Sequence, residues 1–537
     1  MTHLIPVFLV MVPIITSIMI YLVKSEKIVW LTFVSQALSI ALFILYVIGW
    51  NEGVSPVVVF GGWDARFAIS FRVDRITLLF AGLSLFMWSV VLVYLFRKHR
   101  KEHTFIFFFM FLQGVFLGLI QTDDLFNMFV FLELTTVLVT ILIAYQKSGN
   151  AIRAAIYYLL VNTVGAMFLL VGIILLYYVF GTINISMLSG MTASLQDRTV
   201  VRLAYVMMLS GISVKAALFP LFFWLPRAHG VARTPISALL SGLIVKGGVY
   251  MFVRVILMMF PGLSGAFGDV FFWIGAVTGL SGVMFAVVQK EFKQILAYHT
   301  VSQIGIIMMG LSAATGLSFS GGLLHVVNHG LFKGLLFLSA GVIIHAYNTK
   351  NVYEIKGVMK TMPLAGIALL VGILSITGAP FFNGYVSKGL IKTGFSGDLA
   401  KSFVFTLINV GTVTSFVKVT RILFGPAVEL KRKPDLGESV AMMTLAAGCL
   451  VLGVFHGPLA SPVLGADVSY VKLFDVSKWL DYALYIVGGI LFYVTVIRRD
   501  PKPLKGLRNM AVSFEDANTF FLAYLSVMTA IAVFVVL

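Results

Sequence analysis

The stretch Gly211-Ile-Ser-Val-Lys215-Ala-Ala-Leu-Phe-Pro220 interrupts an apolar run that extends from residue 203 to residue 224. Proline removes a backbone hydrogen bond from a helix and clashes with the preceding turn, so this helix should break or kink beside its lysine. A second apolar run, residues 361–392, is interrupted by Gly378-Ala-Pro380-Phe-Phe-Asn-Gly384, just before Lys388. Two long apolar helices, each broken next to a lysine, are the features from which the fold can be predicted.

The composition of the chain is that of a polytopic membrane protein. Of its 537 residues 60% are hydrophobic and 11% are charged, whereas soluble domains carry about 25% charged residues. The net charge of +17 comes mostly from short loops without a basic aromatic patch, so the predicted partner is the anionic lipid bilayer and not nucleic acid. The single cysteine, Cys449, lies in an apolar run and excludes a disulfide framework within the chain.

Sixteen apolar stretches are long enough to cross a bilayer, which requires about 20 residues per helix. The first is interpreted as a retained helix, because it lacks the basic segment and the cleavage site of a signal peptide. No soluble domain fits between the stretches, so the predicted fold class is an all-α polytopic membrane protein. The predicted spans are residues 4–23, 28–49, 74–96, 104–121, 124–146, 154–180, 203–224, 234–260, 269–289, 294–314, 319–346, 361–392, 399–424, 439–458, 478–497 and 517–537.

Loop charge predicts how these spans are oriented. If Lys24 and Lys27 lie in the cytoplasm and the chain then alternates, most loop lysines and arginines fall on the cytoplasmic side, including the blocks at 97–101, 431–433 and 498–508. Cytoplasmic loops of membrane proteins are enriched in these two residue types. The even number of spans then places both termini outside.

The two broken spans are the seventh and the twelfth, and an odd offset inverts one unit relative to the other in the membrane. Paired broken helices at matching places are typical of transporters built from inverted repeats, although proline is also ordinary in membrane helices. The predicted organisation comprises N-terminal helices one to four in 1–121, a first repeat of helices four to eight in 104–260, a second repeat in 269–424 and C-terminal helices in 439–537.

An embedded acid and an embedded lysine are predicted to meet at the first break. Placing an ionisable side chain at the centre of a membrane helix costs roughly 2.5–3.5 kcal/mol, and such residues usually mark an ion or proton path. Glu133 lies nine residues after Asp124, which is roughly 13 Å along a helix and near the middle of the membrane. Lys215 is its predicted partner, because carbonyls freed by the break can solvate an ammonium group. A purely structural salt bridge between two helices is the alternative.

Further ionisable residues extend the predicted path. Lys246 is flanked by small residues that allow close helix approach, although its side chain could instead reach the membrane surface. His325, His329 and Lys333 recur every four residues, so they share one helix face. Because histidine titrates nearest to neutral pH, this face is predicted to relay protons toward Lys388. The alternative, a metal site at the two histidines, lacks an HExxH motif and further acids, so no metal and no cofactor are predicted.

Other charged residues have ordinary structural explanations. Two acids at the start of a span are expected to cap a helix, and a third is expected to cap a helix or to form an interfacial pair; these are Asp123, Asp124 and Asp74. Lys392 is expected to extend to the membrane surface. Arg254 and His345 are expected to be structural.

In combination, these stretches resemble the antiporter-like subunits shared by respiratory complex I, Mrp-type cation/proton antiporters and membrane-bound hydrogenases. The resemblance covers roughly residues 70–425 and is nearest to the D-type subunit of an Mrp antiporter. The motifs that carry it are Asp124–Thr136, Gly211–Pro220, Phe223–His229, Thr234–Lys246, Phe292–Tyr298 with Ser302–Gly305, His325–Lys333 and Gly378–Lys388.

The resemblance implies a core of fourteen helices, two inverted five-helix units and a central line of charged residues. In such proteins an acid of the fifth helix pairs with a lysine of the seventh, and further lysines and histidines lie on helices eight, eleven and twelve. The positions that match are Glu133, Lys215, Lys246, His325, His329, Lys333 and Lys388. The last two predicted spans exceed this core.

Two loop positions depart from the family pattern. Arg227 stands where the family often has an acid, and Arg233 stands where a small residue or a proline is common. Because both lie in a loop, they are predicted to concern contacts with partners more than conduction.

These features predict a proton-translocating subunit that works with other membrane subunits in a prokaryotic cell membrane. The sequence leaves open whether Na⁺ is also moved, whether the chain transports ions alone, and whether the parent complex is an Mrp-type antiporter, an NADH:quinone oxidoreductase or a hydrogenase. A quinone-reducing enzyme is disfavoured, because the chain has no Rossmann glycine motif and no ligand set for an iron–sulfur cluster.

Overall fold

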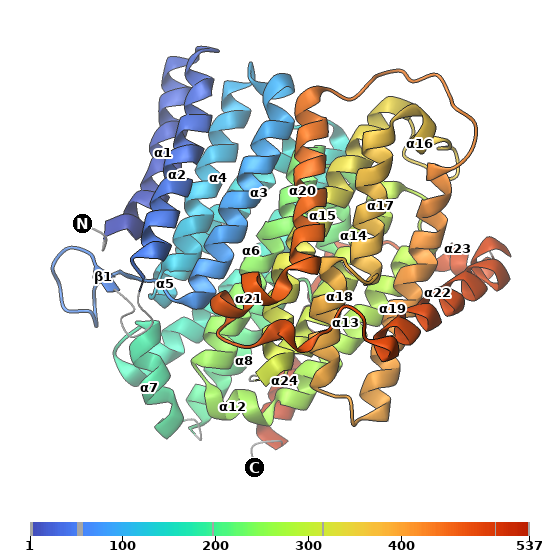
Figure 1. Cartoon of the computed structure of the whole chain (residues 1–537). Helices are drawn as coiled ribbons and strands as arrows, with labels where there is room; N and C mark the ends of the chain where they lie inside the picture. Colours follow the sequence, from blue (N-terminus) through green and yellow to red (C-terminus); the bar gives the residue numbers. More distant parts are fainter. Residues whose placement is uncertain (1–3, 51–56, 196–197, 314–315, 500, 535–537) are drawn as a thin grey trace.

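The computed structural model describes residues 4–50, 57–195, 198–313, 316–499 and 501–534. These residues form a bundle of α-helices (Figure 1), in agreement with the predicted all-α class. Within the described ranges, the strands are limited to β1 (Val57–Val59) and β2 (Ser70–Arg72), which pair antiparallel.

The first four helices lie side by side at one end of the bundle (Figure 1). They are α1 (Ile5–Val23), α2 (Leu31–Ile48), α3 (Arg75–His99) and α4 (His103–Gln121). Asp74 caps α3 by accepting a hydrogen bond from the backbone N–H of Thr77, and it also forms an ion pair with Arg254. Asp74 is therefore both a cap and one half of a structural pair.

The next part of the chain contains the first helix break. Its helices are α5 (Leu125–Ala144), α6 (Gly149–Phe180), α7 (Ile185–Leu195), α8 (Thr199–Lys215), α9 (Trp224–Val231), α10 (Thr234–Leu239), α11 (Val245–Met251) and α12 (Pro261–Ala266). Short π-helical segments before and after α11 make the span from Thr234 to Met258 continuous. Asp124 caps α5 as predicted, whereas the carboxylate of Asp123 accepts from the Ser186 hydroxyl instead.

The following helices contain the second break. They are α13 (Gly268–Val288), α14 (Phe292–Leu311), α15 (Gly316–Tyr347), α16 (Val358–Thr361), α17 (Pro363–Thr377), α18 (Asn383–Thr393) and α19 (Leu399–Thr420). Almost all of α15 is buried, so it lies at the centre of the second half of the bundle.

The C-terminal helices pack against helices of both halves of the bundle. They are α20 (Leu436–Val454), α21 (His456–Leu464), α22 (Val476–Thr495), α23 (Lys502–Arg508) and α24 (Phe514–Phe534). Figure 1 shows α22 lying obliquely beside the more upright α19. The last helix, α24, packs on α8, where the hydroxyl oxygens of Ser213 and Tyr524 are 2.9 Å apart. The C-terminal segment therefore connects the second half of the bundle back to the first.

The predicted spans correspond closely to the observed helices. Among the described residues, fourteen helices are long and apolar enough to cross a membrane. The two remaining predicted spans, 203–224 and 361–392, are the ones interrupted by proline. In the first, α8 ends at Lys215, and the second is divided between α17 and α18. The predicted last span, 517–537, falls on α24 as far as Phe534, and its final three residues lie outside the described part.

Each break contains a non-glycine residue in the left-handed backbone region. Ala217 has φ 55° in the first break, and Phe381 has φ 70° in the second, three residues after Gly378 at φ 82°. Such residues cost of order 1–3 kcal/mol and persist only where the surrounding packing fixes them. Helix ends also leave backbone carbonyls without a partner in the helix. The breaks thus provide polar backbone atoms inside an otherwise apolar bundle.

Candidate functional site

The first break holds the predicted ion pair. Nζ of Lys215, the last residue of α8, lies 3.0 Å from Oε1 of Glu133 on α5 and donates to Oγ1 of Thr136 at 2.7 Å. The lysine side chain is 5% exposed and the glutamate side chain is 22% exposed. The ammonium group is therefore buried between α8 and α5, whereas the carboxylate is partly exposed on the surface of the described chain.

Close packing fixes α11 against this break. A Cβ atom at Gly248 would lie 2.4 Å from the backbone nitrogen of Ala216 and 2.5 Å from the carbonyl carbon of Lys215. Small residues commonly permit such contacts between membrane helices. Lys246 lies two residues before Gly248 on the same short helix, so this contact also determines where Lys246 is held.

A hydrogen-bonded bridge joins Lys246 to Lys333. Nζ of Lys246 donates to the carbonyl oxygen of Ser241. The hydroxyl oxygen of Ser241 lies 2.7 Å from that of Thr300, which donates to the carbonyl oxygen of Leu296 at 3.1 Å. Nζ of Lys333 donates to the same carbonyl at 2.5 Å. The bridge connects α11 to α15 through α14, and both ammonium groups are fully buried.

The two histidines of α15 have different surroundings. Nδ1 of His325 lies 2.8 Å from the hydroxyl of Ser387 on α18, and Nε2 lies 3.1 Å from Oε1 of Gln303 on α14. The ring of His329 is stacked toward that of His325, with centroids 6.3 Å apart. Among the described residues, no side chain or backbone group bonds to either nitrogen of the buried His329. Buried polar atoms are nearly always satisfied, so His329 is a place where water would bind.

Lys388 lies in α18, just after the second break. Its Nζ donates to the carbonyl oxygen of Ile376 at 2.6 Å and to Oδ1 of Asn409 at 2.8 Å. The Ile376 carbonyl belongs to the last turn of α17, so a carbonyl freed by the break solvates this ammonium group as expected. Unlike Lys215, Lys388 has a neutral amide and not a carboxylate as its side-chain partner.

The seven predicted residues thus form three groups. Glu133 contacts Lys215, Lys246 is bridged to Lys333, and the histidines lie next to α18, which carries Lys388. In the part of the chain that the structure describes, no direct hydrogen bond joins one group to another. Transfer between the groups therefore requires water or movement of a lysine side chain.

Several buried polar residues near this line were not predicted from the sequence. His229 and His299 are fully buried, and within the described ranges their ring nitrogens have no partner. The neutral partners of the path are Thr136, Ser387, Gln303, Asn328, Asn383 and Asn409. All of them are polar side chains inside predicted spans. Many other residues of the chain also fit that description, so it does not identify the partners of the path.

Three cations have partners that the sequence did not identify. The Lys392 side chain is 31% exposed, and its Nζ lies 2.6 Å from Oδ2 of Asp481 on α22. The Arg227 guanidinium lies 4.0 Å from the ring of Tyr157 and donates to the backbone of the C-terminal segment. Arg233 pairs with Glu102 at 2.8 Å. Arg227, predicted to lie in a loop, is inside α9, and Arg233 is the N-cap of α10. Both contact other residues of this chain.

Two acids with a raised pKa lie at the N-terminal end of α5. Burial raises the pKa of both Asp123 and Asp124 above the usual range for aspartate.

Among the described residues, no three side chains of the types His, Cys, Asp and Glu come together as a metal site would require. The embedded constellation consists of cations, histidines and a single carboxylate, a set suited to exchanging protons.

Comparison with known proteins adds to this geometry. The family described as "NADH:quinone oxidoreductase/Mrp antiporter, TM" matches residues 122–416. A relative from Staphylococcus aureus (strain MRSA252) named "Putative antiporter subunit mnhD2" is 30% identical over 418 residues, which cover 75% of this chain and 82% of the relative.

Two solved structures have a similar fold. A chain of the Mrp complex from Dietzia sp. DQ12-45-1b superposes with a TM-score of 0.80 at 24% identity, covering 90% of this chain and 99% of that one. A chain of respiratory complex I from Thermus thermophilus superposes with a TM-score of 0.77 at 20% identity, covering 88% and 100%.

Proposed function

Because this chain belongs to the NADH:quinone oxidoreductase/Mrp antiporter family of membrane proteins, we propose that it is a proton-translocating, antiporter-like subunit of a multisubunit membrane complex. The observation that carries the proposal is the ion pair between Lys215 and Glu133 at a helix break. A second lysine, Lys388, donates to the Ile376 carbonyl at the other break. Buried lysines at two breaks, with histidines between them, support proton transfer across the bundle.

The proposed path has a direction and an order. Protons enter from the cytoplasmic side near Lys246, exchange with Lys215, pass along Lys333, His329 and His325, and reach Lys388 near the outer side. When Lys215 and Glu133 are in contact, each stabilises the charge of the other. When the pair separates, the ammonium group loses that stabilisation and can release its proton. Glu133 is partly exposed, so it is also the residue through which a neighbouring subunit could influence this step.

The two halves are proposed to be inverted repeats, residues 104–260 and 269–424. In the first, the broken span has its lysine before the break, and in the second the lysine follows the break. The broken spans are the seventh and the twelfth, so an alternating chain crosses the membrane in opposite directions at the two positions. An inverted pair requires this arrangement. We also place both termini on the outer side of a prokaryotic cell membrane, with the basic loops inside.

The proposed partners are other membrane subunits, since the relative from Staphylococcus aureus is named as a subunit and the similar folds occur in complexes. The basic loops would contact anionic lipids. Protons are proposed as the ion for this chain because Na⁺ prefers several hard oxygen ligands. The embedded path offers one carboxylate, Glu133.

The proposal is tested by purifying the complex in mild detergent, identifying the copurified chains and reconstituting it in vesicles with a pH-sensitive dye. We expect proton movement with the intact complex and none with this chain alone. Proton movement by the isolated chain would instead indicate a self-sufficient antiporter. A complex that contains all its subunits but moves no protons would contradict the proposal. The identities of the copurified chains would show which kind of complex this subunit belongs to.

The bridge between Lys246 and Lys333 provides a finer test. Thr300→Val keeps the shape of the side chain but removes the hydroxyl that joins Ser241 to Leu296. We expect proton flux to fall about fivefold, the factor that corresponds to one hydrogen bond of about 1 kcal/mol. Thr300→Ser retains the hydroxyl and should keep most of the flux. These bonds end on backbone carbonyls, so they would position the two lysines and not carry the proton itself. Equal flux in both variants would show that this positioning does not affect proton transfer.

A further inference from the structure

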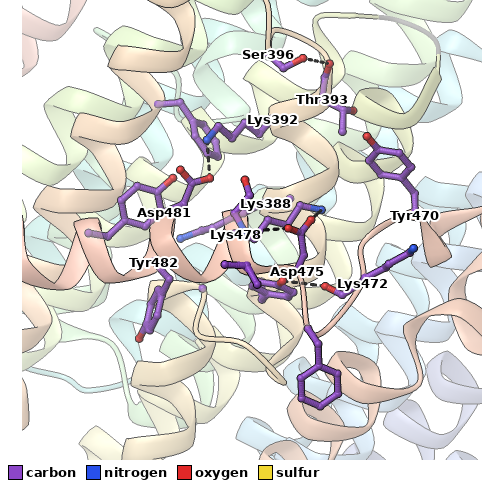
Figure 2. A pocket seen from close by; sticks show the side chains of 18 of the residues that line it. Lys388, Lys392, Thr393, Ser396, Tyr470, Lys472, Asp475, Lys478, Asp481 and Tyr482 are labelled. Carbon is purple, nitrogen blue, oxygen red and sulfur yellow. Dashed lines mark hydrogen bonds and ion pairs between the residues drawn. The ribbon is translucent and has the colours of Figure 1, made fainter.

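A large cavity leads from the outer side of the protein to Lys388. It has a volume of about 900 Å³ and lies between α18, α19 and α22, as Figure 2 shows for its lining side chains. Ser396, Tyr470 and Lys472 line its exposed part, whereas Lys388 at its inner part is only 5% exposed. A space this much larger than one water molecule, lined by charged groups, is suited to hold water.

Two ion pairs bring carboxylates into this cavity. Nζ of Lys392 lies 2.6 Å from Oδ2 of Asp481, and Nζ of Lys478 lies 3.8 Å from Oδ2 of Asp475. Lys392 follows Lys388 by one helical turn, so the two ammonium groups lie on the same face of α18. Both aspartates belong to α22 or its N-cap, outside the residues that match the family. The oblique α22 and its N-cap therefore supply carboxylates to the end of the path that contains Lys388.

We infer that this cavity is the outer release vestibule for protons leaving Lys388, and that the carboxylate of Asp481 accepts them. The inference rests on the proposed function. The Lys388 ammonium gives a proton through water to the Asp481 carboxylate, which leaves a neutral amine and a neutral carboxylic acid. The acid then gives the proton to water at the outer side, and Asp481 regains its negative charge.

The charges around Lys388 favour loss of its proton. While Asp481 is protonated it no longer attracts Lys392, so the pair can open toward the outer part of the cavity. The cavity holds more positive than negative side chains, because four lysines face two aspartates: Lys388, Lys392, Lys472 and Lys478 against Asp475 and Asp481. Like charges at close range disfavour a second positive charge, so a proton that has left Lys388 is hindered from returning while Lys392 remains charged.

The test compares charge variants in the assembled complex. We expect Asp481→Asn to lower proton flux about tenfold, less than the 10²–10⁴-fold effect typical of an acid–base group because cavity water can carry part of the protons. Asp481→Glu should restore most of the flux. Asp467→Asn, which alters an outer acid that does not line the cavity, should leave flux unchanged.

A double variant separates a proton acceptor from a structural ion pair. Asp481→Asn leaves Lys392 without its partner, whereas Lys392→Gln combined with Asp481→Asn removes both charges. If the pair only holds α22 in place, the double variant should recover flux, and that result would overturn the inference. If Asp481 accepts protons, the double variant should remain as slow as Asp481→Asn, in a complex of normal composition and thermal stability.

Access from outside is measured independently of transport. With the buried Cys449 replaced by alanine, Ser396→Cys and Lys478→Cys should react with a membrane-impermeant thiol reagent added from the outer side. Absence of labelling at both positions would show that the cavity is closed to outer water, as it would be if lipid filled it.

Normal flux in Lys215→Ala would refute the proposed function itself. Loss of flux in Lys215→Ala together with normal flux in Asp481→Asn would refute only the role of the cavity as a release vestibule.

Discussion

Lys215→Ala will abolish proton transport by a complex that still assembles. The substitution removes the ammonium group that contacts both Glu133 and Thr136, and no other lysine donates to Glu133 in the described structure. Removal of a positioned acid–base group typically slows proton transfer by 10²–10⁴-fold, which would leave flux near that of vesicles without the complex. The measurement is dye-reported proton flux, with the subunit composition checked on the same sample.

A second substitution at the same site distinguishes charge from proton exchange. Lys215→Arg retains a positive partner for Glu133, but a guanidinium is not deprotonated in proteins. If Lys215 carries protons, this variant should also lose flux even when the complex assembles normally. Substantial flux in Lys215→Arg would mean that only a structural cation is needed there, and the path would have to bypass this residue.

Gly248→Ala should impair both stability and transport, because its Cβ would overlap the backbone at the first break. The distances of 2.4 Å to the nitrogen of Ala216 and 2.5 Å to the carbonyl carbon of Lys215 are too short for a non-bonded contact of a Cβ atom. Forcing extra atoms into a packed interior typically costs about 1–3 kcal/mol. Because Lys246 belongs to α11, displacement of this helix would also move Lys246. We therefore expect a larger fall in proton flux than in melting temperature.

The matched control for this substitution is Gly265→Ala in α12. A Cβ at Gly265 would have no neighbour within 4 Å, so the same chemical change should alter neither melting temperature nor flux. A Gly248→Ala variant that melts and conducts like the wild-type complex would show that α11 and α8 can separate without cost. In that case their contact would not position Lys246.

The sequence predicted the breaks and the Lys215–Glu133 pair for clear physical reasons. Proline and glycine act on the backbone locally, so the breaks could be placed from a few neighbouring residues. An acid and a lysine at matching depth in an apolar bundle have few other partners. The fourteen continuous helices followed from hydropathy in the same way.

The partners of the other path residues could not be predicted, because they depend on tertiary packing. Asn409 meets Lys388 across 21 residues and Asp481 meets Lys392 across 89 residues of sequence. Neutral Asn, Gln and Ser side chains also carry no charge that would distinguish them from ordinary buried polar residues. Hydropathy showed that residues 478–497 can cross a membrane, but the tilt of α22 depends on its contacts with α19.

The packing of α24 on α8 has a consequence for how the protein is made. Ser213 of α8 and Tyr524 of α24 are separated by 311 residues along the chain. At translation rates of about 5–20 residues per second, roughly 15–60 s pass between synthesis of these two residues. During that interval the helix that ends at Lys215 is already in the membrane without the neighbour that later covers it. Completion of the last helix therefore sets the earliest moment at which the first half of the bundle can reach its final packing in a living cell.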